Sequence, residues 1–96
     1  ENIASSELER VIHMIPEVAD VAVIASPDPK WGEVPLAVVV LEPDTSLDFD
    51  QLAGFCREHL AGFKCPKGLR VVDELPRNPS GKILKRVLRD QVLSDT

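Results

Sequence analysis

The sequence predicts a small α+β domain, in which three helices pack on a three-stranded sheet. Two valine-rich segments on either side of a turn-forming stretch are typical of a β-hairpin, and three other segments carry apolar residues at helical spacing. A chain of 96 residues, 44% of them hydrophobic, can build one modest core without disulfides or a metal. We therefore expect residues 1–96 to form a single domain.

The first helix is predicted within "ASSELERVIHMI", residues 4–15. Four apolar residues follow the i, i+3, i+4, i+7 spacing of a buried helix face: Leu8, Val11, Ile12 and Ile15. Ser6 and Glu9 have the spacing of a capping box, and Pro16 follows the last residue of the pattern. We expect a helix that ends just before Pro16.

Two strands are predicted next, at "EVADVAVIASP" (17–27) and "EVPLAVVVLEP" (33–43), with "PDPKWG" as the turn between them. Both segments are apolar at successive positions, so the hairpin should be covered on both faces. A third strand is predicted at "LRVVDEL" (69–75). These strands form the sheet of the predicted fold.

The second helix is predicted within residues 47–63, where Asp48 is a suitable N-cap, Gln51 follows three residues later, and Gly62 lies near the end. The last helix is predicted at "KILKRVLRDQVL", residues 82–93. Its inner face should carry four apolar residues: Leu84, Val87, Leu88 and Val92.

The net charge of −5 conceals an uneven distribution. Residues 1–63 contain three basic and twelve acidic residues, whereas residues 64–89 contain eight basic and two acidic residues. This pattern predicts a concentrated positive field at the C-terminal end, suited to a nucleotide, a polyphosphate or a nucleic acid. The alternative is a solvated helix face with lysines in the flanking loops.

Several functional classes can be tested against the sequence. A Walker-type phosphate loop is excluded because Pro76 and Ile83 occupy the positions that need a glycine and a hydroxyl residue. No apolar run reaches the ~20 residues that span a bilayer. Cys56 and Cys65 have neither metal-ligand spacing nor a disulfide framework around them, which fits idle thiols in a reducing, cytoplasmic compartment. We expect no metal site in this chain.

Lys82 is the residue that best combines chemistry with position. It follows the Pro79-Ser80-Gly81 turn, whose glycine allows close approach of a partner, and it falls at the predicted start of the last helix, where free N–H groups favour anions. A cation at that end is poorly matched to the helix dipole. This suggests that Lys82 meets a ligand anion, although an exposed lysine without a role has the same pattern.

Four motifs occur in a fixed order: "ENIASSELERVI", "PDPKWGEVPLAVVV", "HLAGFKCPK" and "LPRNPSGKILKRVLRD". Together they resemble the C-terminal domain of adenylate-forming enzymes, and more narrowly that of acyl-CoA synthetases acting on fatty or aryl acids. The resemblance covers essentially the whole chain. It implies a parent enzyme that couples a carboxylic acid to ATP, forms an acyl-adenylate and transfers the acyl group to coenzyme A.

The resemblance also implies a mobile lid over a larger N-terminal domain that holds ATP, Mg²⁺ and the acid. Lys82, with Ser80 and Gly81 of its turn, would enter that site and bridge the carboxylate and the phosphate-ribose oxygens. Its charge would stabilise the negative charge that develops when the carboxylate attacks the α-phosphate. In this interpretation Lys82 is the catalytic residue of the domain.

A second face of the lid is implied to receive CoA after a rotation. The passage of the pantetheine arm is lined in the family at positions that match Glu1, Asn2 and Trp31. Phe63 matches the position of an aromatic that stacks on the CoA adenine. Lys67 matches a basic position near the CoA phosphates. The alternative for Trp31 is a loop tryptophan that covers the hairpin.

One position departs from the family pattern. Cys65 stands where some relatives place an arginine, which puts one of the phosphate contacts implied by the resemblance in doubt. Lys64 or Arg70 are the candidates to replace it.

Since the chain begins at Glu1, we expect a fragment that lacks the N-terminal domain and is inactive alone. Two other functions remain open. One is the lid of a carrier-protein-dependent adenylation domain. The other is a non-enzymatic nucleic-acid-binding module, which the charge favours but the absence of aromatics after Phe63 does not.

Overall fold

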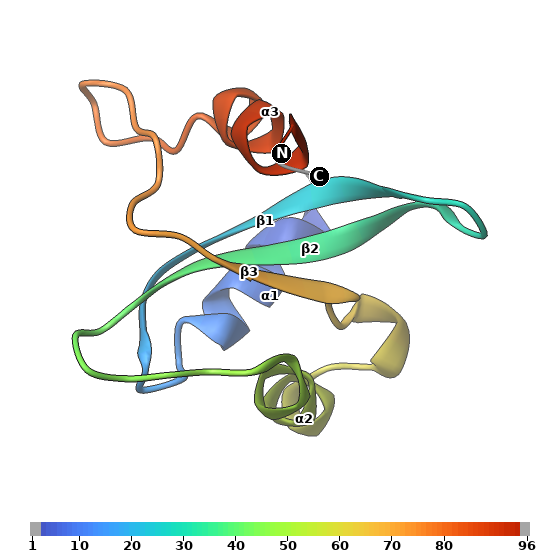
Figure 1. The fold of residues 1–96 in the computed structure, drawn as a ribbon. Coiled ribbons are helices and arrows are strands. Elements are labelled where there is room, and N and C mark those ends of the chain that lie inside the picture. The colour runs from blue at the N-terminus through green and yellow to red at the C-terminus, as the bar shows by residue number, and fades with distance from the viewer. Residues whose placement is uncertain (1–2, 95–96) are drawn as a thin grey trace.

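The computed structural model describes the backbone of residues 3–94 and the side chains of residues 5–94. The elements follow in the order α1 (Ile3–Ile12), β1 (Val18–Asp28), β2 (Gly32–Leu41), α2 (Phe49–His59), η1 (Gly62–Lys64, a short 3-10 helix), β3 (Gly68–Val71) and α3 (Lys85–Ser94). Figure 1 shows the sheet as the middle layer, with α3 on one face and α1 and α2 on the other. The predicted α+β fold of three helices and a three-stranded sheet is confirmed.

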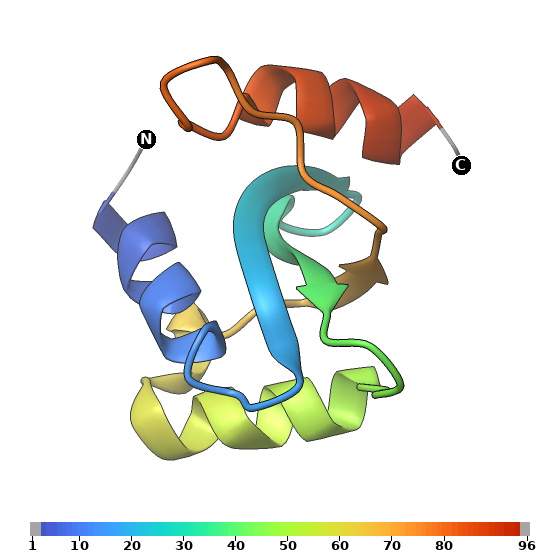
Figure 2. The same ribbon diagram turned by 90° about the vertical axis from the view of Figure 1, so that its left-hand side faces the viewer.

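The sheet has the strand order β1-β2-β3. The hairpin strands β1 and β2 pair antiparallel, whereas β3 pairs parallel with β2. A parallel neighbour requires a crossover connection, and α2 lies in that connection. Figure 2, turned by 90°, shows how α1 and α2 together cover the face of the sheet opposite α3.

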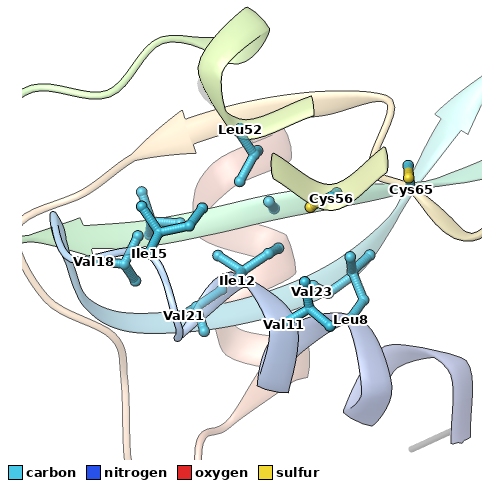
Figure 3. Packing of buried hydrophobic residues seen from close by; sticks show 12 residues of the cluster. Leu8, Val11, Ile12, Ile15, Val18, Val21, Val23, Leu52, Cys56 and Cys65 are labelled. Atoms are coloured by element: carbon cyan, nitrogen blue, oxygen red, sulfur yellow. The ribbon is translucent and has the colours of Figure 1, made fainter. Parts of the chain in front are cut away.

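Alternate residues of the hairpin serve two separate apolar clusters. Val21 and Val23 of β1 point into the cluster with α1 and α2, whereas Ala22 and Ile24 point into the cluster with α3. Figure 3 shows side chains from α1, β1 and α2 meeting in the larger cluster. The expectation that both faces of the hairpin are covered is therefore confirmed.

The start of α1 differs from the prediction. The helix begins at Ile3, so Ser6 lies inside it and no capping box forms with Glu9. The Glu9 carboxylate instead accepts a hydrogen bond from the Val23 backbone N–H at 2.8 Å. The helix also ends at Ile12, before Pro16, although Ile15 is still buried.

The start of α3 differs for a related reason. Residues 82–84 belong to the preceding loop, because Ile83 forms a β-bridge with Arg77, and α3 begins at Lys85. Leu88 and Val92 are buried as predicted, but Leu84 is exposed and Val87 is 42% exposed. Only a narrow stripe of this helix meets the sheet.

The other predicted elements need smaller corrections. The capping box at Asp48 and Gln51 is confirmed, and α2 ends at His59, so Gly62 belongs to η1. The strand β3 spans only Gly68–Val71. In the described part of the chain, no helix has the length and apolar character needed to cross a membrane.

Candidate functional site

Residues 76–84 form a tight loop that carries Lys82; we call it the Lys82 loop. The Asn78 N–H donates to the Lys82 carbonyl at 2.9 Å, and the Leu84 N–H donates to the Pro76 carbonyl at 2.8 Å. Gly81 has φ of 92°, in the left-handed region that glycine adopts readily. The loop is thus a short hairpin whose tip is Ser80 and Gly81.

The side chain of Asn78 fills the inside of this turn. Its Oδ1 accepts hydrogen bonds from the Ser80 N–H at 3.0 Å, the Ser80 hydroxyl at 2.7 Å and the Lys82 N–H at 3.0 Å. The Gly81 N–H donates to the Asn78 carbonyl at 2.9 Å. The N–H groups of Ser80, Gly81 and Lys82 are therefore all used internally, and none of them is free for a ligand anion.

These contacts correct the sequence-based argument about Lys82. Lys82 does not lie at a helix N-terminus, because α3 starts three residues later. Because the backbone N–H groups of the turn are also occupied, only the Lys82 ammonium group is left to bind an anion. The side chain is exposed, and its Nζ has no partner within the described part of the chain. Ser80 and Gly81 shape the turn, and the Ser80 oxygen can still accept a hydrogen bond.

Phe63 and Lys64 lie in a different part of the molecule. They line a pocket of about 380 Å³, together with residues of α1, β1 and β2. The Phe63 ring is 79% exposed, so it offers an apolar face to solvent at the mouth of this pocket. Lys64 pairs with Glu7 of α1 at 3.2 Å. We call this the Phe63 pocket.

Lys67 and Trp31 do not line the Phe63 pocket. The Lys67 backbone N–H donates to the Pro35 carbonyl, and its side chain is exposed. Trp31 lies at the hairpin turn, where its ring is 66% exposed and Lys30 stands 5.0 Å from the ring centroid. Trp31 belongs to neither apolar cluster, so it does not cover the hairpin.

The candidates to replace an arginine at Cys65 can now be separated. Cys65 is buried in the cluster of α1 and α2, next to Phe63 and Lys64 in the chain. Lys64 lies beside it at the pocket. Arg70 instead donates to the Val92 carbonyl of α3 at 3.2 Å, on the opposite face of the sheet. Arg70 therefore cannot substitute for a cation at the Phe63 pocket.

Phe63, on η1, and the Lys82 loop lie on opposite sides of the sheet, although the Phe63 pocket extends around the hairpin to Ile24, which packs in the cluster with α3. In Figure 1 the loop, drawn in orange, stands beside α3, whereas η1 lies beyond the opposite face of the sheet, next to α2. The structure therefore brings Ser80 and Gly81 together with Lys82, but it does not bring Phe63 to them. Glu1 and Asn2, also predicted to contact CoA, lie outside the described residues.

Half of the basic residues in the predicted concentration of positive charge are paired with carboxylates in the fold. Four of the eight basic residues of segment 64–89 form ion pairs with carboxylates of segment 7–33: Lys64 with Glu7, Arg77 with Asp20, Lys85 with Glu9 and Arg89 with Glu33. Opposite charges that are far apart in sequence thus meet in the fold. This arrangement weakens the case for a nucleic-acid-binding module.

Sequence reasoning missed the two residues that shape and anchor the loop, Asn78 and Arg77. Asn78 had a local signal, since an asparagine two residues before a Ser-Gly pair favours a turn held by its own side chain. Arg77 had none, because its partner Asp20 is 57 residues away.

Comparisons with known proteins agree with this description. Residues 7–82 match the family model described as AMP-binding enzyme C-terminal domain. The long-chain-fatty-acid–CoA ligase FadD13 of Mycobacterium tuberculosis is 45% identical over 91 residues, which are 95% of this chain and 18% of that protein. A peroxisomal benzoate–CoA ligase of Arabidopsis thaliana is 45% identical over 101 residues, covering 94% of this chain and 17% of the ligase.

A solved structure of a Mycobacterium tuberculosis fatty acyl CoA synthetase superposes with a TM-score of 0.87 at 43% identity, over 95% of this chain and 18% of that one. The chain thus spans less than a fifth of the length of these relatives. The family match nevertheless covers most of the present sequence, and the fold and the order of motifs agree with it. The chain therefore belongs to the AMP-binding enzyme C-terminal domain family.

Proposed function

We propose that this chain is the mobile C-terminal domain of an ATP-dependent acyl-CoA ligase, in which Lys82 assists formation of the acyl-adenylate. The supporting observation is the state of Lys82. Its backbone N–H and carbonyl are both hydrogen-bonded inside the Lys82 loop, while its ammonium group is exposed and unpaired among the described residues. Such a group can meet anionic oxygens of a partner domain without breaking any contact of its own.

The chemistry suits a lysine in this setting. When a carboxylate oxygen attacks the α-phosphate of ATP, pyrophosphate leaves and negative charge is spread over the reacting oxygens. A positioned ammonium group stabilises that charge most in the transition state, where it is largest. A point charge on a flexible stem can also be withdrawn once the adenylate has formed.

The second half-reaction needs a different surface. There the CoA thiol attacks the acyl carbonyl, forming the thioester and releasing AMP. Phe63 offers an exposed ring and Lys67 an exposed cation, which match the adenine and the phosphates of CoA, whereas Lys64 would have to leave its ion pair with Glu7 to add a second cation. Because Phe63 and the Lys82 loop lie on opposite sides of the sheet, one reaction centre meets only one of them at a time in this proposal. The domain then moves between the two half-reactions.

ATP and its magnesium ion are held mainly by the rest of the enzyme in this proposal. Among the described residues, no group of three or more histidine, cysteine, aspartate or glutamate side chains is arranged to hold a metal ion. The partner of this domain is then its own N-terminal adenylation domain, with ATP, the carboxylic acid and CoA bound between the two.

The relatives include ligases named for a long-chain fatty acid and for benzoate, so the acid is a fatty or an aryl acid in this proposal. Pyrophosphate release by the complete enzyme over a panel of acids identifies the class. A thioester assay with free CoA and with a pantetheine-bearing carrier protein then separates a CoA ligase from a carrier-dependent adenylation enzyme. We expect thioester formation with free CoA.

The central test replaces Lys82 in the complete ligase. Lys82→Ala should slow acid-dependent pyrophosphate exchange by about 100-fold or more, the usual effect of removing one preorganised electrostatic donor. Thioester formation from supplied acyl-adenylate should keep its rate. Arg86→Ala, which removes another exposed cation four residues away, is the matched control and should leave both rates unchanged.

The complementary variant is Phe63→Ala, which should slow thioester formation from supplied acyl-adenylate and leave pyrophosphate exchange nearly unchanged. Equal losses in both half-reactions for Lys82→Ala would contradict the role of Lys82. Equal losses for Phe63→Ala would contradict the assignment of the second face.

A further inference from the structure

The Lys82 loop is anchored to the sheet through one guanidinium group. Arg77 donates through Nη1 to the Gly81 carbonyl at 2.6 Å and through Nη2 to the Asp20 carboxylate. Gly81 is the residue directly before Lys82, and Asp20 belongs to β1. The two arms of Arg77 therefore join the tip of the loop to a strand of the sheet.

Asp20 is itself held in one orientation. Its Oδ1 accepts a hydrogen bond from the Val21 N–H at 2.9 Å, which leaves Oδ2 for Arg77. The pairing of β1 with β2 shifts register between Val18 and Asp20, and such irregularities re-aim neighbouring side chains. In Figure 2 the Lys82 loop, drawn in orange, and β1, drawn in light blue, both lie on the side of the molecule that faces the viewer. The carboxylate is thus a fixed anchor on a rigid element.

This contact is poorly explained by stability. The side chains of Arg77 and Asp20 are 42% and 30% exposed, and ion pairs at such exposure contribute little to the free energy of folding. Its geometric effect is larger. A loop of nine residues that bears an exposed lysine needs a support against swinging, because small displacements of a catalytic group greatly reduce its effect.

We infer that Arg77 and Asp20 are positioning residues for adenylation, which hold Lys82 at the place where it meets the reacting oxygens. This inference rests on the proposed function of Lys82. Neither residue touches the substrate. They act through the Gly81 carbonyl and hence through the backbone that carries Lys82.

The test uses the complete ligase and acid-dependent pyrophosphate exchange. Arg77→Ala should lower kcat by about tenfold, as expected for a misplaced catalytic group, with KM for ATP and for the acid unchanged within about twofold. Asp20→Asn should lower kcat in the same direction. The double variant should be no slower than Arg77→Ala alone, because both changes break one connection. Arg77→Lys should recover part of the rate.

The decisive comparison is made in the Lys82→Ala background. If Arg77 acts only through Lys82, adding Arg77→Ala to Lys82→Ala should cause no further loss. Arg89→Ala is the matched control, because Arg89 also donates to one carbonyl, of Ala25, and one carboxylate, of Glu33, without touching the Lys82 loop. It should leave the adenylation rate unchanged.

Each other outcome has a distinct meaning. If Lys82→Ala is slow but Arg77→Ala and Asp20→Asn are not, the positioning role is wrong and the proposed function stands. If Arg77→Ala slows both half-reactions equally, or slows adenylation further in the Lys82→Ala background, the residue has a general structural role and the inference is overturned. If Lys82→Ala itself has no effect, the proposed function fails and the inference fails with it.

Discussion

The Cys56 thiol is completely buried on the inner side of α2, and this burial raises its pKa to about 11, with a smaller contribution from Cys65. The folded state therefore favours the protonated thiol more than the unfolded chain does. The resulting stability is fully present below the unfolded pKa of about 8.5 and is lost as the pH rises through the folded pKa. Ionisation of Cys56 at alkaline pH therefore destabilises the folded core. No ligand or catalytic role follows from this raised pKa.

This predicts a pH-dependent effect of Cys56→Ala. At pH 7 the variant should be less stable than the parent chain, because it leaves a small cavity. Between about pH 8.5 and 11 the difference should shrink, because only the parent chain must keep a thiol protonated. Urea unfolding of both proteins across this range checks the prediction. A difference that stays constant up to pH 11 would show that burial does not hold the proton on Cys56.

Single residues also show how far the sequence could define the site. Lys82 became a candidate through its motif, and Phe63 through the resemblance to a family. The turn before Lys82 was predicted from Ser80 and Gly81, which are local signals. Arg77 was missed, because an ion pair with Asp20 exists only after the chain has folded. Local spacing reports on turns and faces but carries no information about contacts across the sheet.

At the scale of elements, the α2 N-terminus is the best-defined boundary in the chain. The Asp48 carboxylate accepts a hydrogen bond from the Gln51 N–H at 2.8 Å, and the Gln51 side chain accepts one from the Asp48 N–H at 2.9 Å.

Asp48→Ala should lower the free energy of unfolding by about 1 kcal/mol. Asp50→Ala, in the first turn of the same helix but outside the box, should cost only about 0.3 kcal/mol through the helix dipole, because this side chain is exposed. Denaturant unfolding of both variants measures the difference, and equal losses would argue against the box.

The other helix starts were misjudged for a physical reason. Ser6 and Glu9 have the spacing of a capping box, but Glu9 is used to bond the Val23 N–H and to pair with Lys85 of α3 at 2.7 Å. At α3, the bridge between Arg77 and Ile83 takes the first residues of the apolar pattern into the loop. In both places a tertiary contact competes with the local helix signal and wins.

At the scale of the whole molecule, one thin sheet joins two apolar clusters. The hairpin strands supply alternate residues to each, so unfolding of these strands disrupts both clusters at once. Ion pairs add further links, since Lys85 and Arg89 tie α3 to α1 and β2. We therefore expect the C-terminal helix to unfold together with the rest of the domain, whereas the sequence alone showed only that this helix has an apolar stripe.

This arrangement predicts one cooperative transition for the isolated chain, with a free energy of unfolding of about 5 kcal/mol, typical of a small domain. Leu52→Ala on the α2 side and Leu88→Ala on the α3 side should each lower it by about 2–5 kcal/mol, because both side chains are fully buried. Val87→Ala, the neighbour of Leu88 on the exposed face of α3, should change it by no more than about 0.5 kcal/mol.

The three variants are compared by urea unfolding followed with far-UV circular dichroism and amide hydrogen exchange. If the two clusters fold as one unit, Leu88→Ala weakens protection in α2 as much as in α3, because both helices open only in the global transition. Loss of protection confined to α3 would show instead that this helix detaches alone. In that case the Lys82 loop, which precedes α3, would still be joined to the sheet through Arg77 and Asp20.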